Sequence, residues 1–187
     1  MAERENPMKV TFVGTSCIGK TTLLDEYRTK FNGNPRVNIV DEAARIYFTQ
    51  NPGTSNRFGK EAQGSVQALA LQQEQAAHES KAEVILCDRS VIDAVVYVKA
   101  SGDQEGALEL LDRVKFWLPT YNKFLLLNPT DVPYQTDEVR QESEQVRQGF
   151  HNAYLEFFEE SGIPYELLSG TLEQRVERVD EILSEKI

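Results

Sequence analysis

A segment near the start of the chain combines two glycines, a lysine and a threonine at the spacing of a phosphate-binding loop. Residues 14–21 read Gly-Thr-Ser-Cys-Ile-Gly-Lys-Thr, which fits G-x-x-x-x-G-K-[ST] at every position. Glycines let backbone N–H groups surround an anion, and the N-terminus of a following helix adds positive potential. The lysine supplies a mobile charge for the outer phosphates, and the threonine hydroxyl is a ligand for Mg²⁺. We predict that a nucleotide triphosphate is bound by Gly14, Thr15, Ser16, Cys17, Ile18, Gly19, Lys20, Thr21 and Thr22.

The segments on either side of this loop support the prediction. The apolar run 8–13 before it has the composition of a strand, and residues 19–30 carry apolar side chains at helical spacing. The alternative is a glycine turn that happens to carry a lysine. A strand before the loop and a helix after it are the context in which this pattern binds phosphate, so they favour the phosphate-binding interpretation.

Acidic residues follow two other predicted strands. Asp88 comes after an apolar run, where a carboxylate in phosphate-loop enzymes holds Mg²⁺ directly or through water. Asp41 and Glu42 end another run, and either carboxylate could accept a proton from a substrate hydroxyl. The alternative for each of the three is helix capping. We predict that Thr21 and Asp88 are metal ligands, and we leave the choice of base between Asp41 and Glu42 open.

Two arginines lie on one face of a predicted polar helix, because Arg140 and Arg147 are seven residues apart. Placed over the phosphates, they would stabilise the charge that develops on the transferred group. The alternative is a solvated helix face on which they pair with neighbouring glutamates. A loop with two prolines precedes this helix. We predict a lid at about residues 129–150, in which Arg140 and Arg147 are catalytic together with Lys20.

Short apolar runs alternate with helical patterns along the whole chain. Strands are predicted at 8–13, 37–40, 83–87, 123–127 and 164–168. Helices are predicted at 19–30, 43–48, 60–81, 92–99, 107–117 and 137–160, and a last one is capped by Thr171, with Glu173 close to the capping-box position. This alternation predicts an α/β domain with a five-stranded, mostly parallel sheet and helices on both faces. Ligands bind beyond the carboxyl ends of such strands, where the acidic residues and the glycine-rich loop fall.

The length of 187 residues is that of one domain, and no repeat or long linker divides it. With 30 acidic and 20 basic residues, the net charge of −10 disfavours nucleic acid as a partner. No run of about 18 apolar residues could span a membrane, and the polar N-terminus lacks the apolar core of a signal peptide. We therefore predict a cytoplasmic protein without a membrane partner. Nothing in the sequence predicts its oligomeric state.

Four segments resemble the AAA-domain ATPase/kinase family that includes the ribosylnicotinamide kinase domain of bifunctional NAD-biosynthesis regulators. They are the loop 14–21, Asp-Glu-Ala-Ala-Arg at 41–45, Asp-Arg-Ser at 88–90, and residues 131–140, which follow D-x-P-aromatic-x-x-D-x-x-R. The Asp-Arg-Ser segment is also similar to one in deoxynucleoside kinases and, more loosely, in thymidylate kinases. The resemblance implies a P-loop NTPase fold, a three-layer α/β sandwich with a helical lid. It also implies that the loop binds ATP and Mg²⁺ with Asp88 near the metal, that Glu42 or Asp41 lies near the acceptor, and that Arg140 belongs to the lid.

These observations together predict an ATP- and Mg²⁺-dependent kinase. Its acceptor would be a hydroxyl or phosphate of a nucleoside-like or nucleotide-like small molecule, with nicotinamide riboside as one candidate. A regulatory GTPase is disfavoured because residues 88–91 lack the glycine of D-x-x-G. Two alternatives remain: a nucleotide-binding switch or interaction protein that hydrolyses ATP or GTP slowly, and a polynucleotide 5′-kinase, which the negative net charge disfavours.

Overall fold

Five short strands pair in parallel in the order β2-β3-β1-β4-β5. The structure is a computed structural model that describes residues 6–131, 144–184, 186 and 187. The strands are β1 (Met8–Val13), β2 (Val37–Val40), β3 (Val84–Asp88), β4 (Lys123–Leu127) and β5 (Glu166–Leu168). Every predicted strand is present, and all described pairings are parallel. Strands β1, β3 and the later part of β4 are buried, as expected for a sheet covered on both faces.

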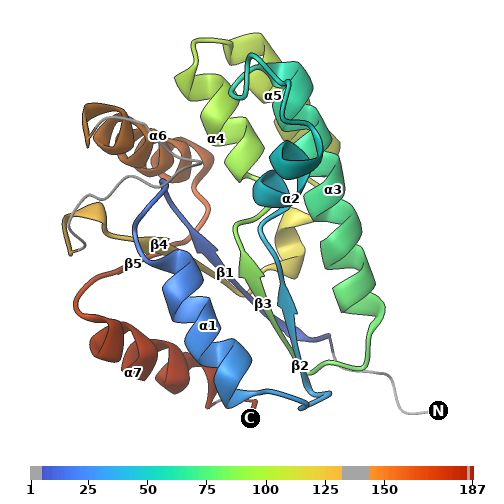
Figure 1. Cartoon of the computed structure of the whole chain (residues 1–187), viewed down its shortest axis with the longest axis vertical. Coiled ribbons are helices and arrows are strands. Elements are labelled where there is room, and N and C mark those ends of the chain that lie inside the picture. Colours follow the sequence, from blue (N-terminus) through green and yellow to red (C-terminus); the bar gives the residue numbers. More distant parts are fainter. Residues whose placement is uncertain (1–5, 132–143, 185) are drawn as a thin grey trace.

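Helices cover both faces of this sheet (Figure 1). They are α1 (Lys20–Lys30), α2 (Ala43–Gln50), α3 (Lys60–Glu79), α4 (Asp93–Ala100), α5 (Gln104–Val114), α6 (Glu144–Ser161) and α7 (Leu172–Leu183). Helices α1 and α7 pack on one face, and α2 to α6 lie on the other. The predicted three-layer α/β sandwich is therefore confirmed. None of the described helices is long and apolar enough to cross a membrane.

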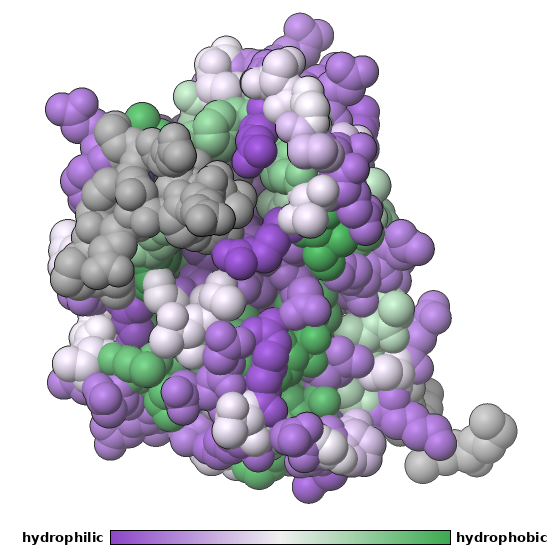
Figure 2. Space-filling model, viewed as in Figure 1, coloured by the Kyte–Doolittle hydropathy of each residue, from purple (hydrophilic) through white to green (hydrophobic). Residues whose placement is uncertain are grey.

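Two large hydrophobic cores, one on each face, and a smaller cluster beside α3 hold the layers together, while hydrophilic residues cover most of the face seen in Figure 2. On one side, Phe12 and Leu86 of the sheet pack with Leu23 of α1 and Val179 of α7. On the other, side chains from β4, α4, α5 and α6 form the second core. The alternation of side chains along each strand supplies both cores from the same sheet.

A charged pair is buried beside the second core. Lys9 of β1 and Glu74 of α3 are 0% and 1% exposed, and Lys9 Nζ lies 2.9 Å from Glu74 Oε2. The Glu74 carboxylate also accepts hydrogen bonds from Trp117 Nε1 at 2.8 Å and Tyr121 Oη at 2.7 Å. The Lys9 ammonium lies over both aromatic rings. This packing satisfies charges that would otherwise be costly to bury.

The ends of several helices differ from the predictions. Helix α5 begins earlier than predicted because Asp103 caps it, accepting from Gly106 N at 2.8 Å. In α7, Thr171 is the N-cap as predicted, but the capping-box partner is Gln174 and not Glu173, since Gln174 occupies the third helical position. The first part of the helix predicted at 137–160 lies outside the described residues, and α6 covers the rest.

Candidate active site

The loop between β1 and α1 has the backbone conformation of an anion cradle. Gly14 has φ +130°, and a Cβ added there would lie 2.7 Å from Ile18 Cδ1. Gly19, immediately before α1, has φ +86°, a left-handed conformation that favours glycine. The two glycines of the motif are therefore required by the shape of this loop. The loop places the first turn of α1 at one end of the sheet. The N–H groups of this turn have no partner inside the helix.

Lys20 folds back over this loop. Its side chain is buried, and Nζ donates to the carbonyl oxygens of Thr15 at 2.6 Å and Gly14 at 3.2 Å. These bonds hold the ammonium group over the loop backbone. The lysine is thus placed where a bound phosphate would attract it.

The predicted metal ligands Thr21 and Asp88 lie side by side. Thr21 Oγ1 donates to Asp88 Oδ2 at 3.4 Å, which joins the start of α1 to the end of β3. A hydroxyl and a carboxylate are the oxygen donors that Mg²⁺ takes in nucleotide sites, where it keeps waters and phosphate oxygens as its other ligands. The residues present therefore fit Mg²⁺.

A cavity of about 310 Å³ lies beside the phosphate loop, over the carboxyl ends of β2 and β3. Ser16 of the loop and Asp88 form part of its wall. Its apolar wall includes Phe48, Phe58 and Tyr97, and the Phe58 and Tyr97 rings stack with centroids 5.5 Å apart. A small molecule bound in this cavity would lie next to the phosphate-binding loop.

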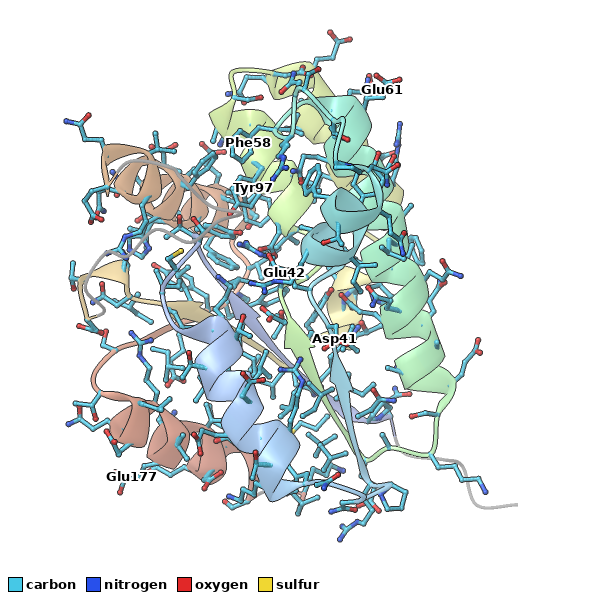
Figure 3. The ribbon with its side chains drawn as sticks, in the orientation of Figure 1. Asp41, Glu42, Phe58, Glu61, Tyr97 and Glu177 are labelled. Carbon is cyan, nitrogen blue, oxygen red and sulfur yellow. The ribbon has the colours of Figure 1, made fainter. Side chains whose placement is uncertain are left out.

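The structure separates the two adjacent carboxylates that the sequence left as alternatives. Figure 3 shows Glu42 between Asp41 and the Phe58–Tyr97 pair. The Asp41 side chain is 64% exposed and pairs with Arg28 Nη2 of α1 at 2.5 Å. The Glu42 side chain is 5% exposed and lines the cavity. Glu42 is therefore the carboxylate that is enclosed beside the loop, whereas Asp41 lies at the rim.

Arg89 holds Glu42 in place, a role that sequence reasoning did not assign. Its Nε donates to Glu42 Oε1 at 2.7 Å, and its Nη1 donates to Asp93 Oδ1 and to the Gly14 carbonyl, both at 2.9 Å. Burial acts to lower the pKa of Arg89, but the surrounding tyrosines and carboxylates hold it well above its ordinary value. Arg89 also has φ +73°, a strained conformation that costs roughly 1–2 kcal/mol. The sequence signal for this role was the Asp-Arg-Ser segment. The role depends on Glu42 and Gly14, which lie 47 and 75 residues before Arg89 in the sequence.

Residues 9–175 match a protein family described as an AAA domain. The chain belongs to this AAA-domain family. A search of curated protein sequences finds no match.

Solved structures with the same fold include three kinds of protein. A NadR protein in complex with NAD and AMP-PNP superposes with TM-score 0.73 at 16% identity, over 95% of this chain and 49% of that one. Thymidylate kinase from Candida albicans gives 0.65 at 15% identity, covering 96% and 92%. Deoxyadenosine kinase from M. mycoides gives 0.60 at 17% identity, covering 95% and 100%. This AAA domain therefore has the fold of P-loop kinases, and it spans about half the length of the NadR chain.

In this AAA domain, one of the two predicted lid arginines reaches the phosphate loop. Arg147 of α6 is buried, and its guanidinium donates to the Cys17 carbonyl at 3.2 Å and to the Pro129 carbonyl at 2.7 Å. It also pairs with Glu144, which is one of the contacts that the alternative interpretation expected. Arg140 lies outside the described residues, as does the middle of the predicted lid. The catalytic roles of both arginines stay predictions.

Proposed function

We propose that this chain is an ATP- and Mg²⁺-dependent kinase that transfers the γ-phosphoryl group to a hydroxyl of a nucleoside-like small molecule. The observation that carries the proposal is the position of the cavity: it adjoins the phosphate loop at Ser16 and Asp88, and the buried carboxylate of Glu42 lines it. A phosphate-binding loop, an adjoining acceptor pocket and a carboxylate in the wall of that pocket are parts that phosphoryl transfer to a hydroxyl uses. The kinases that share the fold support the same reaction class.

Each residue of the site has a task in this reaction. The loop amides and Lys20 bind the triphosphate, and Lys20 exchanges its loop carbonyls for phosphate oxygens. Glu42 orients the acceptor hydroxyl and accepts its proton as the oxygen bonds to phosphorus and the nucleoside diphosphate leaves. Arg89 keeps the Glu42 carboxylate aimed into the cavity. Arg147 and Arg140 would stabilise charge from the lid side.

Thr21 and Asp88 are the residues that would hold Mg²⁺. A bound Mg²⁺ would supply positive charge beside the phosphates, which offsets their negative charge during transfer. Asp88 is buried at the end of β3, and an Asp88→Asn change keeps the size of the side chain while it removes the negative charge and one acceptor oxygen. We expect this variant to need a higher Mg²⁺ concentration for half-maximal transfer.

The charges around the cavity favour an uncharged or cationic acceptor over a phosphorylated one. Arg89, the most buried cation among the described residues of the wall, is already bound by Glu42 and Asp93. The other arginines that the described part of the wall contains are Arg45, whose side chain is 52% exposed, and Arg57, which lies 5.1 Å from the centroid of the Phe48 ring. A monophosphate would bring two further negative charges close to carboxylates in a poorly solvated site. We therefore place a nucleoside-type hydroxyl ahead of a nucleotide phosphate as the acceptor.

The test is a screen for transfer of γ-labelled phosphate from ATP to nucleosides, nucleoside monophosphates and nicotinamide riboside. The last belongs in the panel because a NadR protein of this fold is described in complex with NR. Lys20→Ala should reduce transfer by about 100-fold or more, since it removes a charge from the transition state. Lys30→Ala is the matched control, because Lys30 lies on the same helix and pairs with Asp180 at the surface. Steady phosphate release that no acceptor alters would favour the nucleotide-hydrolysing switch instead.

A further inference from the structure

The phosphate loop is held from outside by arginines of the last two helices. Arg175 of α7 is 2% exposed, and its Nη1 donates to the Ile18 carbonyl at 2.8 Å. Arg147 of α6 donates to the carbonyl of the preceding residue, Cys17. Helices α6 and α7 lie on opposite faces of the sheet, so arginines from both faces donate hydrogen bonds to the loop backbone.

Arg175 also ties the loop to the segment after β4. Its Nη2 donates to the Asn128 carbonyl at 3.1 Å and to Asp131 Oδ2 at 3.4 Å. Burial lowers the pKa of Arg175, and the Asp131 carboxylate acts against that shift. The guanidinium therefore links three points of the chain, residues 18, 128 and 131.

The hydrogen bond to Ile18 fixes the direction of an amide that phosphate binding uses. In a trans peptide the C=O of one residue and the N–H of the next point in opposite directions. With the Ile18 carbonyl turned to Arg175, the Gly19 N–H is turned away from α7. Glycine at 19 adopts left-handed backbone angles, and glycine has more accessible backbone conformations than other residues, so a contact on the Ile18 carbonyl restricts the orientation of this peptide plane.

We propose that Arg175 is a positioning residue for triphosphate binding: it holds the Ile18 carbonyl and so keeps the Gly19 N–H directed at the bound phosphates. The proposal rests on the nucleotide binding assigned to the loop under the proposed function. Arg175 does not touch substrate in this arrangement. It acts through the orientation of the loop backbone.

The test measures binding and stability separately from phosphoryl transfer. Calorimetry with Mg²⁺-ATP and with inorganic triphosphate is carried out on the wild-type protein, Arg175→Lys, Arg175→Met and Arg178→Met. Arg178 is the matched control: it lies on the same helix, and its partners Glu166 and Glu181 are at the surface. Unfolding temperatures are measured on the same samples.

We expect Arg175→Met to weaken the binding of both ligands by about 10-fold and by no more than about 100-fold, because the orienting contribution of one charge-assisted hydrogen bond limits the loss. Arg175→Lys should lie between Arg175→Met and wild type, because an ammonium can reach one carbonyl but not two. Arg178→Met should bind like the wild type. If Arg175→Met does not fold, the lysine variant decides, since it is expected to keep the unfolding temperature while it loses affinity.

Wild-type triphosphate affinity in a folded Arg175 variant would overturn the inference, as would an equal loss in Arg178→Met. Both outcomes leave the proposed function intact. Conversely, a wild-type protein that binds ATP and inorganic triphosphate but transfers the γ-phosphoryl group of ATP to no acceptor would refute the proposed function alone. Failure of the wild-type protein to bind triphosphate would refute both.

Discussion

The clearest prediction compares the two adjacent carboxylates by changing each to its amide. Glu42→Gln preserves the size of a buried side chain and its ability to accept from Arg89 Nε, now 2.7 Å away, but removes its capacity to take a proton. Asp41→Asn makes the same chemical change at a side chain that is 64% exposed. Because the two positions are consecutive, each variant is the control of the other.

The structure sets the expected magnitudes. Loss of a general base lowers the rate by about 10²- to 10⁴-fold, or roughly 3–5 kcal/mol in activation free energy. Weakening the hydrogen bond between Glu42 and Arg89 lowers the free energy of unfolding by about 1–3 kcal/mol, because Arg89 keeps Asp93 as a partner. The Asp41–Arg28 pair is at the surface, so its loss costs about 0–1 kcal/mol, and transfer should stay within about twofold of wild type.

The assay measures phosphoryl transfer, ATP affinity and the midpoint of urea unfolding for both variants. We expect Glu42→Gln to keep its ATP affinity, since the phosphate loop is unchanged, and to lose transfer by far more than its stability explains. If Asp41→Asn loses transfer and Glu42→Gln keeps it, the enclosed carboxylate is not the base and the reasoning from burial is wrong. If both keep it, no carboxylate of this segment acts as the base.

Three further predictions test other parts of the structure. Cys17 lies on the phosphate loop and is partly exposed, whereas Cys87 is buried and burial raises its pKa. An alkylating reagent should therefore modify Cys17 and spare Cys87 in the native protein, and Mg²⁺-ATP should slow the modification of Cys17. Burial lowers the pKa of His151 below its ordinary value of 6.5, so the folded state binds the proton less readily than the unfolded chain does. The free energy of unfolding should therefore fall as the pH drops below about 6.5, and His151→Gln should reduce this pH dependence, measured by urea unfolding at several pH values. Lys9→Met leaves the Glu74 carboxylate buried without its cation and should lower the free energy of unfolding by about 3–5 kcal/mol. An unchanged urea midpoint would mean that the hydrogen bonds from Trp117 and Tyr121 are enough to stabilise the buried carboxylate.

Local sequence patterns predicted the strands and the phosphate loop because each is encoded in a short run of neighbouring residues. Each strand is a short apolar run, and the loop is recognisable from two glycines, a lysine and a threonine at fixed spacing. The segment 8–21 therefore carried most of the information about nucleotide binding, whereas the fold was predicted from the alternation of apolar runs and helical patterns along the whole chain. Helix ends were less predictable, because a cap such as Asp103 or Gln174 is selected by one residue of register.

The acceptor side of the site could not be predicted in the same way. The choice between Asp41 and Glu42 depends on which side chain turns toward Arg89, a residue 47 positions after Glu42. The role of Arg175 depends on a carbonyl 157 positions before it, and backbone carbonyls leave no trace in residue type. Both contacts are created by the parallel sheet, which brings the ends of distant strands together.

The same long-range contacts join the two halves of the site. Arg89 donates both to the Gly14 carbonyl of the phosphate loop and to the Glu42 carboxylate in the cavity, at 2.9 and 2.7 Å. A displacement of the loop would therefore be transmitted to the Glu42 carboxylate, which the proposed function places beside the acceptor. A change at Arg89 would alter nucleotide binding and acceptor chemistry together, so it cannot distinguish them. Glu42 and Arg175 are better probes because Glu42 contacts Arg89 in the cavity, whereas Arg175 contacts the loop backbone at Ile18.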